Sequence, residues 1–158
     1  SAAKSLYNAD SRKPYVYAHT GPDIVRIANR VKEMAQAHEE GLATPIQIYC
    51  PGNDYWPLPW YLRGYRVEYT NTVAEASPSA PIILIQPPLE SALMRKLYEL
   101  PPPGQKELYM HLFYDDGQVP YMELRPQVEM RGFVAKSLWD RHERARAEAE
   151  STIQGPQQ

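Results

Sequence analysis

Pro81-Ile82-Ile83-Leu84-Ile85 is the most apolar segment of this 158-residue sequence. An unbroken apolar run of this length is typical of a parallel strand that helices cover on both faces. We therefore expect this segment to lie in the interior of a sheet. The run is also far shorter than the roughly 20 apolar residues that a membrane-spanning helix needs, so the sequence as given predicts no span.

The segments before this strand alternate between β-prone runs and apolar residues at helical spacing. A strand, a helix and a second strand in succession form a βαβ unit, whose two strands are parallel. Pro101-Pro102-Pro103 ends the last helix of this part. Strands are predicted at residues 15–19, 45–50 and 66–69, and helices at residues 20–41, around Trp60 and at residues 89–100.

The C-terminal third predicts a hairpin and then a helix. Residues 108–114 and 119–124 flank Asp115-Asp116-Gly117-Gln118, which favours two antiparallel strands joined by a turn. In the second strand, Glu123 and Arg125 share one face, where they are expected to form an ion pair or a surface patch. From Met130 the pattern is helical, with its packing side formed by Phe133, Val134 and Leu138.

The fold class that these elements predict is α/β: a three-layer sandwich with a mixed, mainly parallel sheet and a C-terminal antiparallel hairpin. The length fits one domain with tails. Residues 1–13 are expected to be a tether, residues 14–140 the α/β domain, and residues 141–158 a charged helical tail with a disordered end.

Composition excludes several classes of partner and cofactor. A net charge of −2 and a pI near 6.1, with basic residues scattered among acidic ones, argue against nucleic acid. Cys50 is the single cysteine, so no internal disulfide and no thiolate zinc cluster can form. No glycine-rich loop follows the first strand, so a nucleotide is not expected. We predict no metal and no cofactor.

Polar and aromatic residues follow the ends of the predicted parallel strands. In such sheets ligands bind beyond the carboxyl ends of the strands, so these residues are expected to share one rim. A carboxylate, an imidazole, amides and aromatic faces are the groups that bind a sugar or another polar ligand. The candidate ligand-binding residues are His19, Asn53, Asp54, Tyr55, Trp56, Trp60, Arg63 and Gln86.

Structural roles are the alternative for the same residues. Asn53 and Asp54 would cap a turn, and the tryptophan pair would pack over the sheet edge. A second alternative is a nucleophile at Cys50 with His19 as its base, since the two strand ends would lie near each other. A cysteine at the end of a buried strand is more often an inert small apolar residue.

Three segments carry a resemblance to a known family. They are Pro14-Tyr15-Val16-Tyr17-Ala18-His19-Thr20, Tyr55-Trp56-Pro57-Leu58-Pro59-Trp60-Tyr61-Leu62-Arg63 and Tyr121-Met122-Glu123-Leu124-Arg125-Pro126. The chain resembles, over residues 14–139, the C-terminal extracytoplasmic domain of polytopic membrane proteins related to dolichyl-phosphate-mannose protein mannosyltransferases, a group described as flippase-activity-associated. The middle segment is the most distinctive, since it sets two tryptophans and two prolines at fixed spacing.

The resemblance implies a membrane glycosyltransferase with a lipid-linked sugar donor, whose catalytic acid lies among membrane helices that this chain lacks. The chain would then be a soluble accessory or binding domain that is not catalytic by itself. It would lie at the cell membrane on the extracytoplasmic side, periplasmic or outer, with residues 1–13 as the junction. Its partners would be the membrane-embedded portion of the same polypeptide and a glycan or acceptor.

Two other functions remain open from the sequence. One is a protein–protein interaction or structural module that docks on the membrane portion or on a partner through its Trp-Pro segment. The other is an autonomous small α/β enzyme, which would need a deep pocket with converging titratable groups.

Overall fold

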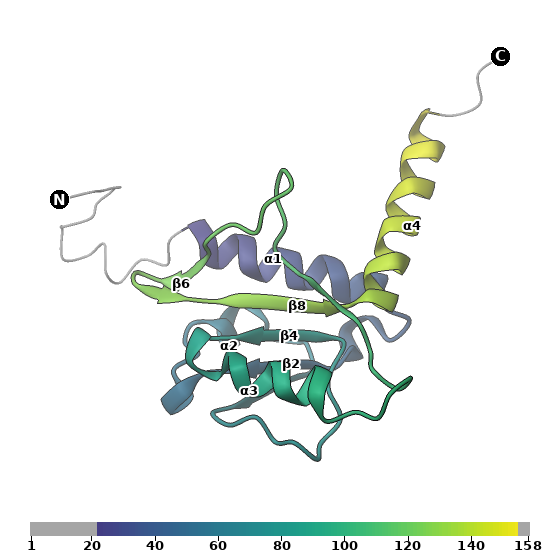
Figure 1. Cartoon of the computed structure of the whole chain (residues 1–158). Coiled ribbons are helices and arrows are strands. Elements are labelled where there is room, and N and C mark those ends of the chain that lie inside the picture. Colours follow the sequence, from purple (N-terminus) through teal and green to yellow (C-terminus); the bar gives the residue numbers. More distant parts are fainter. Residues whose placement is uncertain (1–21, 155–158) are drawn as a thin grey trace, which may run out of the picture.

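The computed structural model describes residues 22–154, which form a central five-stranded sheet with helices on both faces (Figure 1). The strand order is β3-β2-β4-β8-β5. β2 is parallel to both β3 and β4, whereas β8 is antiparallel to β4 and to β5. The α/β class and the mixed sheet are therefore confirmed. The strands are β2 (Ile46–Tyr49), β3 (Val67–Thr70), β4 (Ile82–Ile85), β5 (Tyr109–His111) and β8 (Arg131–Ala135).

Strand β4 lies in the interior of the sheet, as its apolar sequence predicts. All four of its residues are fully buried. Because successive side chains of a strand point to opposite faces, Ile82 and Leu84 join one core while Ile83 and Ile85 join the other. The sheet thus separates two apolar clusters.

Helices cover the two faces and complete the three layers. α1 (Pro22–Ala37) buries its apolar side against the first cluster. On the other face, Leu93 of α3 (Glu90–Met94) and Leu97 of the π-helical turn η5 (Arg95–Glu99) pack in the second cluster. Figure 1 shows α1 and α3 on opposite sides of the sheet. The short helices are η2 (Gly41–Ala43), η3 (Pro51–Asn53), α2 (Leu58–Tyr61) and η4 (Pro87–Leu89).

The antiparallel hairpin is present, but its strands are not the expected pair. β6 (Glu123–Arg125) pairs with β7 (Val128–Glu129), while β5 pairs with β8 instead of with the segment at 119–124. Between them only the bridge from Asp115 to Gln118 forms. Pro120 has no N–H to donate to a ladder, which explains why the pairing does not extend from this turn.

The helix expected from Met130 begins later than the sequence pattern indicates. Residues 131–135 form β8, and α4 (Lys136–Gln154) starts only after them. Phe133 and Val134 lie in different clusters on opposite faces of the sheet, as neighbours on a strand must. Leu138 is the first of the expected packing residues that lies in a helix.

Gly132 in β8 is required by close packing. A Cβ built at this position would lie 2.9 Å from Cβ of Leu112 and 2.9 Å from Cε2 of Phe113. Replacement by alanine is therefore expected to destabilise the fold by about 1–3 kcal/mol, the usual cost of overpacking. Urea denaturation of Gly132→Ala measures this cost. An unchanged midpoint would show that β5 and β8 can move apart freely.

The expected first strand, at residues 15–19, lies outside the described residues, as do the tether at 1–13 and the last four residues of the tail.

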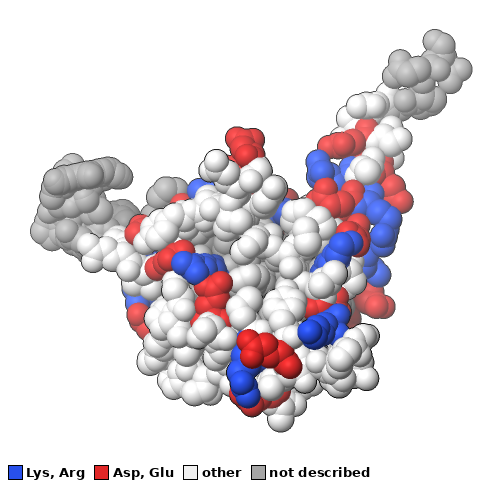
Figure 2. Space-filling view, viewed as in Figure 1, with Lys and Arg blue, Asp and Glu red and all other residues white. Residues whose placement is uncertain are grey.

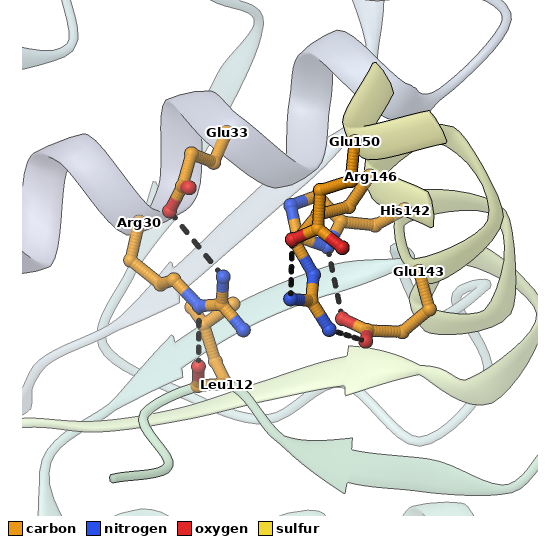
Figure 3. A network of polar contacts seen from close by, with 7 residues as sticks. All are labelled: Arg30, Glu33, Leu112, His142, Glu143, Arg146 and Glu150. Atoms are coloured by element: carbon orange, nitrogen blue, oxygen red, sulfur yellow. Dashed lines mark hydrogen bonds and ion pairs between the residues drawn. The ribbon is translucent and has the colours of Figure 1, made fainter. Parts of the chain in front are cut away.

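The root of α4 is fixed to α1 through Arg30. Its Nε donates to the carbonyl oxygen of Leu112 at 3.0 Å, and its guanidinium lies 5.4 Å from the ring centre of Trp139. Figure 3 shows Arg30 bonded to Leu112 and Glu33, beside a second polar group on α4 formed by His142, Glu143, Arg146 and Glu150. Beyond its root, α4 extends away from the body of the molecule (Figure 1). Within residues 22–154, no helix is both long and apolar enough to cross a membrane.

Candidate functional site

The carboxyl edge of the parallel strands brings Asp54 and Gln86 together, as the sequence predicts. Gln86 follows β4 and is buried, and its side-chain Nε2 donates to the carbonyl oxygen of Asp54 at 2.9 Å. Its backbone N–H donates to Tyr49, the last residue of β2, at 3.0 Å. The ends of β2 and β4 are thus joined directly, and the Gln86 amide occupies the space between them.

Arg125 is the partner of Asp54, which the sequence pattern does not reveal. The Arg125 guanidinium forms an ion pair with the Asp54 carboxylate and donates to the carbonyl oxygen of Trp56 at 2.6 Å. Glu123 instead accepts from the hydroxyl of Tyr121 and from the N–H of Gln127. Of the two expectations for Glu123 and Arg125, the ion pair between them is therefore wrong. The β6–β7 hairpin supplies a cation to the connection between β2 and β3.

Trp56 and Trp60 are exposed, with 62% and 56% of their areas accessible. The alternative that they pack over the sheet edge is therefore wrong. The guanidinium of Arg63 lies 3.9 Å from the ring centre of Trp60, and its Nη1 donates to the Trp60 carbonyl oxygen at 2.7 Å. We call Trp56, Trp60 and Arg63 the tryptophan surface.

Tyr55 and Asn53 have structural roles next to this surface. The Tyr55 ring packs against Tyr69 of β3, with the ring centres 4.7 Å apart. Burial raises the pKa of Tyr69 to about 12. Asn53 adopts a positive φ of 58° at the end of η3, a conformation that asparagine tolerates better than most residues. With Leu58 and Leu62 fully buried, the backbone under the tryptophan surface is firmly held.

Cys50 does not have the environment of a nucleophile. Its side chain is fully buried, and burial, with a smaller contribution from Asp54, raises the pKa of the thiol to about 12. The proposed base, His19, lies outside the described residues. In the described part of the chain, no three His, Cys, Asp or Glu side chains are grouped so that they would hold a metal ion.

A cavity of about 280 Å³ lies farther along the same edge of the sheet, and we call it the edge cavity. Arg131, which lines this cavity, is at the start of β8 and pairs with Ile85 at the carboxyl end of β4. The cavity therefore lies at the same edge as Gln86. Sequence reasoning missed this group because its residues come from separate elements. The edge cavity is lined by Glu90, His111, Phe113, Val119, Pro120, Tyr121, Glu129, Met130, Arg131 and Gly132.

A larger cavity, of about 470 Å³, lies at the opposite edge of the sheet. Its buried polar side chain, Gln47, is fully engaged. Nε2 donates to Glu68 and to the Pro78 carbonyl oxygen, and Oε1 accepts from Tyr49 and from the Ala80 N–H. These bonds hold the loop before β4 in place and leave this amide nothing to offer a ligand.

Two surfaces therefore flank the β6–β7 hairpin at the carboxyl edge. Arg125 of β6 contacts the connection that carries the tryptophan surface, and Glu129 of β7 lines the edge cavity. No family model matches the chain, and no match was found among curated proteins or solved structures.

Proposed function

We propose that this chain is an extracytoplasmic binding domain of a membrane glycosyltransferase that uses a lipid-linked sugar donor. In this proposal the tryptophan surface contacts the glycan or its acceptor beside the membrane-embedded portion of the same polypeptide. The resemblance of the segment from Tyr55 to Arg63, which contains both tryptophans, supports the assignment to such a protein.

The observation that carries the proposal is the exposure of two tryptophans on an anchored backbone. Leaving a large apolar side chain in water instead of burying it forgoes about 1.5–3 kcal/mol, so exposed large aromatic rings are candidates for a binding surface. Trp56 and Trp60 lie four residues apart, on either side of the start of α2. Sugars place the apolar face of their ring on such aromatic side chains.

The ion pair of Asp54 and Arg125 supplies the polar half of the site. The Asp54 side chain is half exposed, so its carboxylate can still accept hydrogen bonds from hydroxyl groups. Arg125 fixes that carboxylate next to the Trp56 backbone. An aromatic face with an oriented carboxylate at its side matches a carbohydrate better than it matches an apolar partner.

Catalysis is assigned to the membrane-embedded portion of the polypeptide. The thiol of Cys50 is held protonated by its raised pKa, so it would be a poor nucleophile at neutral pH. The chain would act by positioning a glycan or acceptor, which contributes to a reaction through proximity and orientation.

Trp56→Ala and Trp60→Ala are expected to weaken glycan binding by about 5- to 150-fold each, since a stacking ring contributes about 1–3 kcal/mol. The chain should stay folded, because both rings are exposed. Titration of neutral oligosaccharides by NMR on this chain, and glycan transfer by the full-length protein, measure the effect.

Tyr114→Ala is the matched control, since Tyr114 is an exposed aromatic residue away from the tryptophan surface. It lines a separate cavity next to Arg26 and Arg30 of α1. This variant should bind and transfer normally. Full transfer activity in both tryptophan variants would contradict the proposal. Normal glycan binding with impaired association to the membrane portion would instead identify the tryptophan surface as a docking site.

A further inference from the structure

The edge cavity contains a triad of charged side chains, formed by Arg131, Glu129 and Glu90. Some of their hydrogen-bond donors and acceptors have no partner among the described residues. Arg131 Nε donates to Glu129 Oε2 at 2.8 Å, its Nη2 donates to Glu129 Oε1 at 3.3 Å, and its Nη1 donates to Glu90 Oε1. Arginine has five N–H groups, so the bonds made by the described residues leave two of them for a ligand. Glu90 is held through Oε1, which leaves its Oε2 as an acceptor.

The charge of this triad selects the kind of ligand. One guanidinium between two carboxylates has a formal charge of −1, so a phosphate or carboxylate ligand meets net repulsion. A neutral ligand with neighbouring hydroxyl groups is matched, because one hydroxyl can donate to the free carboxylate oxygen while another accepts from the guanidinium. On the face seen in Figure 2, charged side chains lie in separate groups on a surface whose other residues are uncharged.

The walls of the edge cavity are apolar and aromatic. Phe113 and Met130 are buried, and the exposed ring of Tyr121 stands at the cavity with its hydroxyl bonded to Glu123. The His111 ring lies tilted against Phe133, with the ring centres 5.3 Å apart. A volume of about 280 Å³ lies just below the usual range of small-molecule pockets, which suits a single sugar ring.

We infer that the edge cavity is a subsite for one neutral hexose unit. Glu90 and Arg131 would hold neighbouring hydroxyl groups, and Phe113 and Tyr121 would face the apolar side of the ring. This inference rests on the proposed glycan-binding function and deepens it, since it places a second sugar unit across the β6–β7 hairpin from the tryptophan surface. It also excludes a sugar phosphate from this position.

The test is an NMR titration of the full 158-residue chain with methyl glucoside, methyl mannoside and glucose 6-phosphate. The neutral glycosides should give saturable shifts at backbone amides that line the edge cavity, such as those of Glu129 and Gly132. Glucose 6-phosphate should bind about tenfold more weakly or not at all. Shifts that rise linearly without saturation, or equal binding of the phosphate, would overturn the inference.

Two variants separate binding from folding. Val119→Trp should fill the edge cavity and abolish the shifts, while Val25→Trp, at a comparably exposed position on α1, should bind like the original chain. Glu90→Gln keeps the side-chain shape, weakens neutral binding about tenfold and reduces the preference over the phosphate, because the triad becomes neutral. Unchanged binding in Val119→Trp would place the sugar elsewhere.

The outcome also distinguishes the two proposals. If Trp56→Ala abolishes oligosaccharide binding while Val119→Trp does not, the tryptophan surface is the site and the edge cavity is not a subsite. If Val119→Trp abolishes binding of the single-ring glycosides while Trp56→Ala leaves it intact, the edge cavity binds sugar independently of the tryptophan surface.

Discussion

Leu84→Ala is expected to lower the free energy of unfolding by about 3 kcal/mol, within the usual range for leucine truncation in a core. Leu84 has no accessible surface and lies in β4, between β2 and β8. Because β4 is hydrogen-bonded to β2 on one side and to β8 on the other, its backbone cannot shift to fill the space left by the removed methyl groups. The cavity should therefore persist. Chemical denaturation followed by circular dichroism measures the change.

Leu42→Ala is the matched control for this substitution. Leu42 is 63% exposed in η2, so the same truncation removes little buried surface. Its effect should stay within about 0.5 kcal/mol, as for most surface substitutions. Equal destabilisation by the two variants would mean that β4 is not the centre of the folded core.

The thiol of Cys50 is expected to react with iodoacetamide at pH 8 about a thousandfold more slowly in the folded chain than when unfolded. The thiolate is the reacting species, and burial raises the thiol pKa from its ordinary value of 9.0 to about 12. This rise lowers the thiolate fraction at pH 8 about a thousandfold. Full burial of the side chain adds a steric barrier. Mass spectrometry before and after urea unfolding gives the two rates.

Ser151→Cys provides the internal control for this experiment, because residue 151 is exposed near the end of α4. The introduced thiol should be alkylated rapidly while Cys50 in the same molecule stays unmodified. Rapid alkylation of Cys50 in the native state would show that the end of β2 opens, and would restore Cys50 as a candidate nucleophile.

The elements that the sequence predicts well are those with one dominant pattern. β4 is buried on both faces, so its unbroken apolar run has a single explanation. In α1, apolar residues recur at helical spacing on one side only, and that side is the buried one. The sequence predicts both elements with the correct type, although α1 ends at Ala37 and not near Gly41.

The sequence pattern predicts a helix where β8 lies, because β8, like β4, is a strand buried on both faces. A strand buried on both faces has no polar alternation, and next to the helical sequence that follows, Phe133 and Val134 fit either period. The local sequence pattern also cannot predict which strand pairs with β5. Its pairing with β8 joins segments separated by the whole β6–β7 hairpin, so only the tertiary arrangement selects it.

The sequence predicts those residues of the candidate site whose place follows from the strand topology. Parallel strands end at one edge, which places Asp54 near Gln86. The contact of Arg125 with the backbone of Trp56 spans 69 residues and depends on where the hairpin packs, so no local pattern reports it. Exposure of the tryptophans could not be inferred either, since the same rings could have covered the sheet edge. The edge cavity gathers residues from β5, β7, β8 and α3.

The projection of α4 has a mechanical consequence. From Arg144 onward its residues are exposed, and the remaining 11 helical residues extend about 16 Å at the usual rise per residue. Arg30 contacts the ring of Trp139 at the base of α4. The 15 steps from Trp139 to Gln154 span about 22 Å, so a rotation of about 10° at this contact would displace the far end of α4 by about 4 Å.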